Sequence, residues 1–172
     1  APAIREGMNE GILRSLGEGG YASEGFARRS VWGSTSNEQP LKILSELIKD
    51  DGYGEKIKLG IDVAASQFFQ KGDYQLEGKK ITKTELLEVY KNLFKNFPLV
   101  YLLEDIFEEN DFESFKLLKD ACPDELIVGD DLTTTNPERI IEAQKQGSIN
   151  GLIIKPNQIG TLTEVFKAAE LT

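Results

Sequence analysis

Four short apolar runs in the sequence are each followed by a charged residue, and the charged residues are of the types that metal-assisted proton abstraction requires. They are Asp62, Glu104, Asp130 and Lys155. Their successive separations of roughly 25 to 40 positions match a strand with its returning helix and loops. The charges therefore recur once per strand–helix unit at the carboxyl end of the strand, where parallel α/β proteins place their active sites.

The segments around these residues predict alternating strands and helices. Strands are expected over residues 56–61, 99–103, 125–129 and 151–154. Helices are expected over residues 37–50, 82–97, 111–120, 136–147 and from 161 to the end of the chain. Thr82 and Thr161 begin sequences typical of capping boxes, and Asn136 is an N-cap followed by proline. A small hairpin is predicted around Lys71-Gly72-Asp73, before Thr82.

This order of elements indicates an α/β fold with a parallel sheet and helices on the outside. Residues 37–172 are expected to form this domain. Residues 1–36 are predicted to form an irregular N-terminal segment, in which residues 4–16 are compatible with a helix. Residues 17–36 are rich in Gly, Ser and Arg and read as a loop.

The composition restricts the partners and the ligands. Apolar residues make up 40% of the sequence and charged residues 28%, as in ordinary globular domains. The net charge of −9 argues against a nucleic acid or an anionic membrane as a partner. The sequence has no histidine and one cysteine, Cys122, so a bound metal must take oxygen ligands, which favours Mg²⁺, Mn²⁺ or Ca²⁺. A single cysteine is also typical of a reducing compartment such as the cytoplasm.

Five stretches of the sequence resemble the motifs of one family. They are Gly60-Ile61-Asp62-Val63-Ala64-Ala65-Ser66, Leu103-Glu104-Asp105, Gly129-Asp130-Asp131-Leu132-Thr133, Thr135-Asn136-Pro137 and Leu152-Ile153-Ile154-Lys155-Pro156-Asn157-Gln158-Ile159-Gly160-Thr161. In order and spacing they resemble the signature stretches of enolase, phosphopyruvate hydratase. The resemblance extends from about residue 37 to residue 172. It implies a TIM-type β/α barrel that is incomplete, because a whole barrel takes roughly 250 residues and eight strands.

The resemblance gives the charged residues separate roles. Asp62, Glu104 and Asp130 resemble the three carboxylate ligands of the family's Mg²⁺, and Lys155 resembles its catalytic base. Asp131 is similar to a residue that supports these ligands. A simpler interpretation fits any one carboxylate alone, since Asp and Glu after a strand commonly cap a helix or lie in a loop.

The general acid has two candidates in the N-terminal segment. Glu18, in Glu18-Gly19-Gly20-Tyr21-Ala22, resembles the glutamate of the family that helps to expel the hydroxyl group. Glu24, in Glu24-Gly25-Phe26-Ala27, is a competing match at a better distance from the following motifs. A turn without a catalytic role is the alternative for the Gly-rich stretch.

The function that the resemblance implies is a Mg²⁺-dependent lyase of glycolysis, which converts 2-phosphoglycerate to phosphoenolpyruvate and water. Lys155 would abstract a proton, and the metal would stabilise the resulting enolate. The partner would be a small phosphorylated three-carbon acid, without nucleic acid or membrane. The alternative is an incomplete, catalytically weak module that binds metal or has a structural role. Because a half-barrel leaves strand edges unpaired, we also expect a homo-oligomer or a longer chain.

Overall fold

The computed structural model describes residues 38–54 and 56–172, and the chain divides into two compact units between Lys58 and Leu59. The helix and loop expected within residues 1–36 lie outside the described residues. In the first unit, α4 (Glu38–Asp50) corresponds to the first predicted helix, with Leu41 and Ile48 buried. Gly52, with φ of 74°, follows the helix in the left-handed conformation that glycine adopts readily at helix ends.

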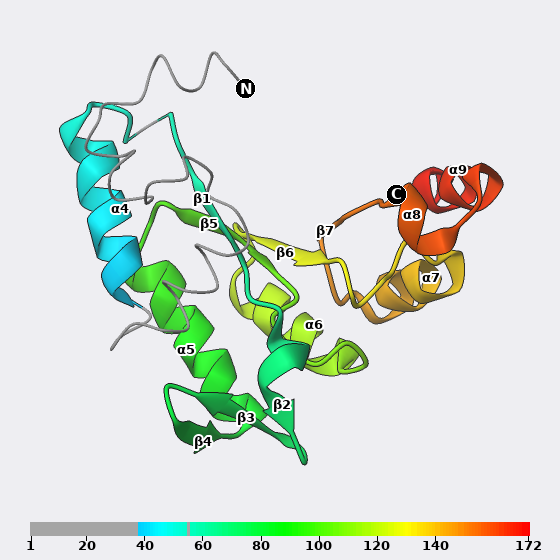
Figure 1. Ribbon diagram of the computed structural model, residues 1–172, viewed down its shortest axis with the longest axis horizontal. Coiled ribbons are helices and arrows are strands. Elements are labelled where there is room, and N and C mark those ends of the chain that lie inside the picture. Colours follow the sequence, from blue (N-terminus) through cyan, green and yellow to red (C-terminus); the bar gives the residue numbers. More distant parts are fainter. Residues whose placement is uncertain (1–37, 55) are drawn as a thin grey trace. The chain divides into compact units, whose positions relative to one another are not determined.

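The second unit is built on a parallel sheet with the strand order β1-β5-β6-β7 (Figure 1). Its strands are β1 (Leu59–Asp62), β5 (Val100–Glu104), β6 (Leu126–Gly129) and β7 (Gly151–Leu152). All three pairings are parallel. The strand order follows the chain order, as successive βα units produce. This sheet confirms the predicted α/β fold.

Three helices return the chain between the parallel strands and cover the sheet. They are α5 (Lys83–Asn96), α6 (Phe112–Ala121) and α7 (Pro137–Gln146). The core of the unit consists of apolar side chains from both layers that are almost fully buried, among them Leu86, Leu103, Phe115, Ile127 and Ile140. After β7 come the short helix α8 (Pro156–Ile159) and α9 (Leu162–Glu170), which lie beside α7 (Figure 1).

The predicted caps account for where these helices begin. Thr82 and Glu85 form a complete capping box at the start of α5. The Asn136 side chain accepts the Glu138 N–H (2.8 Å) before Pro137 begins α7. Thr161 accepts the Glu164 N–H (3.3 Å), while the Glu164 carboxylate accepts the Thr161 hydroxyl (2.6 Å) rather than the backbone N–H that a full capping box uses.

Two predicted strands are shorter than the apolar runs suggested. β1 begins only at Leu59, because the N–H groups of Lys56 and Ile57 donate to the Tyr53 carbonyl in a turn. β7 ends at Leu152, although the Ile153 N–H still donates to the Gly129 carbonyl (3.0 Å). The run before Lys155 is therefore only partly strand.

A three-stranded antiparallel sheet fills the connection between β1 and α5. It consists of β2 (Phe69–Gln70), β3 (Asp73–Leu76) and β4 (Lys79–Ile81), and the short 3₁₀ helix η1 (Ala65–Phe68) precedes it. The pairing of β2 with β3 is the predicted hairpin, whereas β4 is an additional strand. Tyr74 on β3 is 1% exposed and lies edge-on to Phe107, which links this small sheet to the loop after β5. None of the helices in residues 38–54 and 56–172 is long and apolar enough to cross a membrane.

Candidate active site

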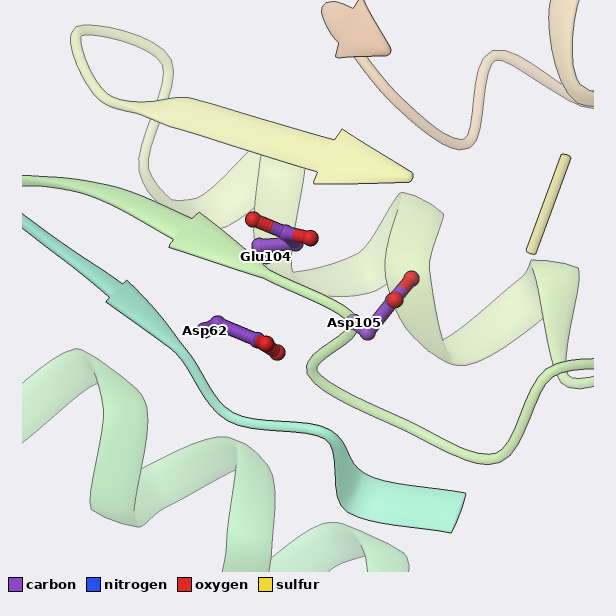
Figure 2. A group of neighbouring side chains, drawn as sticks. All are labelled: Asp62, Glu104 and Asp105. Atoms are coloured by element: carbon purple, nitrogen blue, oxygen red, sulfur yellow. The ribbon is translucent and has the colours of Figure 1, made fainter. Parts of the chain in front are cut away.

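The four charged residues singled out by their spacing lie at the carboxyl ends of the strands of the parallel sheet. Asp62 and Glu104 are the last residues of β1 and β5, and they are partners in the strand register. Asp130 directly follows β6, and Lys155 lies between β7 and α8. Figure 2 shows Asp62 and Glu104 side by side at the ends of their strands, with Asp105 where the chain leaves β5. The parallel topology brings these residues together, since the carboxyl ends of parallel strands all lie at the same end of the sheet.

The carboxylates form two overlapping groups. Oxygen atoms of Asp62, Glu104 and Asp105 lie within 4.8 Å of one another, and so do those of Asp105, Asp130 and Asp131. The three residues predicted as ligands are thus divided between the two groups, which share Asp105. The strand ends therefore carry an acidic cluster, in which Asp105 belongs to both groups.

Asp105 differs from the other carboxylates because backbone donors occupy both of its oxygens. Its Oδ1 accepts the Asp130 N–H (3.0 Å) and its Oδ2 accepts the Asp131 N–H (2.9 Å). The Leu132 N–H also points to Oδ1, at 3.5 Å. Burial raises the pKa of Asp105 to about 6, and these N–H groups oppose that shift. Asp105 therefore holds the backbone that carries Asp130, as an oriented support of the site.

Glu104 carries the clearest electrostatic signal of the site. Burial raises the pKa of the half-buried Glu104 carboxyl group to about 7, and the charges of Asp62, Asp105 and Asp130 add to this shift. A carboxylate surrounded by carboxylates resists ionisation because like charges repel at short range. Among the described residues that act on Glu104, three carboxylates raise its pKa and Lys155 lowers it, so a bound cation would relieve the remaining repulsion.

Lys155 lies against Asp130. Its ammonium group donates to Asp130 Oδ2, and its backbone N–H donates to the Thr135 hydroxyl (2.8 Å). Asp130 is the largest cause of the raised pKa of Lys155, and Glu104 and Asp131 add to it. The backbone of Lys155 is extended (φ −121°, ψ 104°), as expected for a residue before proline. In this arrangement Lys155 is the protonated partner of Asp130.

Two uncharged residues that the sequence analysis did not single out complete this end of the site. The Gln158 amide donates to Asp130 Oδ1 (2.8 Å), so both oxygens of Asp130 have donors. The Thr135 hydroxyl donates to Gln158 Oε1 (3.0 Å). Gln158 belongs to a motif quoted above, but nothing in the spacing of a lone amide distinguishes it from a surface residue.

The backbone is strained beside three of the strand ends. Ala64, Asp105, Thr134 and Thr135 have φ between 47° and 55°. This left-handed region is uncommon for residues other than glycine, and least favourable for a β-branched threonine. Such conformations persist where the surroundings impose them, and they concentrate at functional sites. Here they lie one to five residues after Asp62, Glu104 and Asp130, so the chain turns sharply soon after each of these carboxylates.

The donor atoms of this site fit a hard cation. Carboxylate oxygens are the ligands on offer, the sequence has no histidine, and its single cysteine, Cys122, is buried at the C-terminal end of α6. Oxygen-only sites select Mg²⁺, Mn²⁺ or Ca²⁺ over Zn²⁺. The raised pKa of Glu104 shows that negative charge is crowded here, which any bound cation would relieve. Glu18 and Glu24, the candidates for the general acid, lie outside the described residues.

Comparison with known proteins identifies the family. Residues 18–172 match the family described as enolase, C-terminal TIM barrel domain. The enolase of Aeropyrum pernix is 47% identical over 138 residues, which cover 78% of this chain and 32% of that protein. The enolase of Methanothrix thermoacetophila is 42% identical over 169 residues, which cover 98% of this chain and 38% of that protein. The enolase of Sulfurisphaera tokodaii is 42% identical over 136 residues, or 79% of this chain and 32% of that protein.

The chain therefore belongs to the enolase family, and it corresponds to part of the C-terminal barrel domain. It spans about a third of the length of these curated relatives, from 32% to 38%. Enolases carry out their reaction with metal ions, and the acidic groups of this chain could bind one.

Proposed function

We propose that this chain supplies the cation-binding and proton-accepting part of an enolase active site, which converts 2-phosphoglycerate to phosphoenolpyruvate and water in the glycolysis of the cytoplasm. The observation that carries the proposal is that Asp62, Asp130 and Lys155, from three other strands of the parallel sheet, lie close enough to Glu104 to influence its charge. Residues that only cap helices or lie in loops would have no reason to combine three carboxylates with one lysine at successive strand ends. The family membership adds the reaction and the substrate, a small phosphorylated three-carbon acid.

In this proposal Asp62, Glu104 and Asp130 hold Mg²⁺. Their all-oxygen donor set and excess negative charge support a hard divalent cation. The bound cation would supply positive charge to balance the negative charge that develops on the substrate carboxylate. Asp105 keeps its two oxygens on the backbone of Asp130 and Asp131, and so fixes the position from which Asp130 acts.

Lys155 is the proposed base, which takes the proton from the carbon next to the substrate carboxylate. A lysine accepts a proton only in its neutral form. Its pKa is raised here mainly by Asp130, so Lys155 becomes a base only when the negative charge of the carboxylates is neutralised. The raised pKa of Lys155 favours its protonated form, which suits the reverse direction, in which Lys155 returns the proton. Glu18 is the proposed general acid, with Glu24 as the competing candidate.

The alternative function is a metal-binding or structural module without turnover. One observation favours it. Lys155 is engaged with Asp130 rather than directed at an open position. Both functions predict cation binding, but only the first predicts dehydration of the substrate.

The test is a dehydration assay with 2-phosphoglycerate and Mg²⁺, which follows the formation of phosphoenolpyruvate. We expect Mg²⁺-dependent turnover in the natural full-length protein, and a loss of at least about a thousandfold in kcat for Lys155→Ala, because general-base catalysis contributes about this much. Lys167→Ala is the matched control, since Lys167 is an exposed lysine of α9.

Equal loss in both lysine variants would point to unfolding rather than chemistry, and circular dichroism would show it. Unchanged turnover in Lys155→Ala would contradict the assignment of the base. If the wild-type protein binds Mg²⁺ but gives no phosphoenolpyruvate, the alternative function is the correct one.

A further inference from the structure

Arg139 lies on α7 and has no part in the proposed chemistry. It contacts two of the loops at the acidic cluster, those after β5 and β6. Its Nε donates to the Leu132 carbonyl (2.6 Å), which belongs to the loop after β6. Its Nη1 donates to Asn110 Oδ1 (3.2 Å) and its Nη2 donates to the Glu109 carbonyl, both in the loop after β5. The guanidinium group also lies 5.3 Å from the centre of the Phe112 ring, where α6 begins.

These two loops adjoin two of the predicted ligands. The β5–α6 loop, residues 105–111, directly follows Glu104, the last residue of β5, and the β6–α7 loop, residues 130–136, begins with Asp130. A shift of the β6–α7 loop relative to the β5–α6 loop would therefore move Asp130 relative to Glu104. A planar guanidinium with several fixed donors is suited to hold two backbone carbonyls in one geometry, which a single ammonium group is not.

The loops are joined at two points. Near the strands, Asp105 accepts the N–H groups of Asp130 and Asp131. Farther out, Arg139 joins Glu109 to Leu132. One point of attachment leaves two segments free to rotate about it, whereas two separated points fix their relative orientation.

The β5–α6 loop is also held on its other side by hydrogen bonds to residues that follow β1. The Glu109 N–H donates to the Ser66 hydroxyl (3.0 Å), and the Glu108 N–H donates to the Tyr74 hydroxyl (3.0 Å). Ser66 and Tyr74 belong to η1 and β3, which follow Asp62 in the chain. The peptide groups around Glu109 are therefore bonded from η1 on one side and from α7 on the other.

We propose that Arg139 is a positioning residue that sets the separation of Glu104 and Asp130 by fixing the β5–α6 loop against the β6–α7 loop. Its effect on the cation rests on the proposed function, whereas its effect on the loops does not. Arg139 touches neither the carboxylate groups of Glu104 and Asp130 nor the proposed base. Its loss should weaken cation binding through geometry alone.

The test compares Arg139→Ala and Arg139→Lys with Ile140→Val, a control that removes one methylene from the core beside Arg139 on the same helix. The first measurement is hydrogen exchange of the cation-free chain. We expect faster exchange in Arg139→Ala within residues 105–111 and 130–136, with the strands of the small sheet unchanged. Ile140→Val should leave both loops as in the wild type, and Arg139→Lys should lie between them.

The second measurement is a calorimetric titration with Mg²⁺ on the same variants. We expect about tenfold weaker binding in Arg139→Ala, as is usual when a residue that orients a metal ligand is lost, and wild-type affinity in Ile140→Val. Unchanged exchange in the two loops would overturn the proposal, as would faster exchange that Ile140→Val shares. Unchanged Mg²⁺ affinity despite faster exchange would also overturn it. If the wild-type chain binds no Mg²⁺, the proposed function fails, and the exchange result alone decides the role of Arg139.

Discussion

At the scale of single residues, the site depends on buried polar groups that hold the backbone just after Glu104. The Asp105 carboxylate accepts N–H groups from the next loop, and the Tyr90 hydroxyl donates to the Ile106 carbonyl (2.7 Å). Ile106 is fully buried, so water could not replace Tyr90 as the donor to its carbonyl. A buried acceptor that loses its donor costs more than an ordinary hydrogen bond is worth. Tyr90 of α5 thus stabilises the loop that follows Glu104.

The first prediction concerns Tyr90→Phe. The variant removes the donor to Ile106 but keeps the ring, which packs edge-on to Phe107. We expect the free energy of unfolding to fall by about 1 to 2 kcal/mol, measured by urea denaturation. Tyr101→Phe is the matched control, because Tyr101 is 40% exposed and should tolerate the change. Equal losses in the two variants would contradict a specific role for the Tyr90 hydroxyl.

Tyr90→Phe should also change how stability depends on pH. Burial raises the pKa of Tyr90 well above its usual value, and the charge of Tyr74 adds to the shift. The tyrosines of the unfolded chain ionise near pH 10, so above that pH the unfolded state loses protons first. Stability from this residue is therefore fully present below about pH 10 and decreases as the pH rises above it. The decrease should be smaller in Tyr90→Phe than in Tyr101→Phe.

The residues that could be predicted are those with a spacing signal. Apolar runs at intervals of one strand–helix unit precede Asp62, Glu104, Asp130 and Lys155. The structure places these four residues at or just after the carboxyl ends of the parallel strands. Gln158, Thr135 and Arg139 could not be found in this way. Their partners are far away in the sequence, and their effect depends on which donor meets which acceptor in the folded chain. The left-handed backbone of Thr135 is a further example, because threonine has no local preference for it.

At the scale of elements, helices were predicted more accurately than strands because their ends carry chemical signals. Thr82, Asn136 and Thr161 cap α5, α7 and α9 as predicted. The ends of strands carry no such signals. Because the apolar runs continue into turns, the strands predicted from them were longer than β1 and β7. The additional strand β4 contains Lys79-Lys80 and is largely exposed, so it lacked the apolar pattern by which a strand is recognised.

The second prediction tests the capping box at the start of α5, the helix that returns the chain to β5. Thr82→Ala removes the hydroxyl that accepts the Glu85 N–H and leaves this N–H without its cap. We expect a loss of about 1 kcal/mol in the free energy of unfolding, measured by urea denaturation. Thr84→Ala changes an exposed threonine within the first turn of the same helix and should cause no loss. If Thr84→Ala were the more damaging variant, the cap would not be what fixes this end of α5.

At the scale of the whole molecule, the described part of the chain contains four parallel strands of a TIM barrel domain, with the acidic cluster at their carboxyl ends. The parallel sheet of the second unit has β1 and β7 at its edges, and the chain spans about a third of its curated relatives. Within the described residues β1 and β7 each have one neighbouring strand in this sheet, so their outer edges can pair with a strand from elsewhere. Light scattering of the protein in solution tests whether a second copy supplies that strand.

The central claim is that Asp62, Glu104 and Asp130 together bind a divalent cation, and a calorimetric titration with Mg²⁺ tests it most directly. The protein set is the wild-type chain, Asp62→Asn, Glu104→Gln, Asp130→Asn and the control Asp120→Asn, whose carboxylate is exposed on α6 and pairs with Lys116. Because each change removes a negative charge and a proposed ligand, binding should weaken by more than the tenfold to hundredfold effects known for outer-shell residues. We predict saturable binding of one Mg²⁺ to the wild type and to Asp120→Asn, and a large loss of affinity in all three ligand variants. Wild-type affinity in any of the three, or no saturable binding to the wild type, would contradict the account.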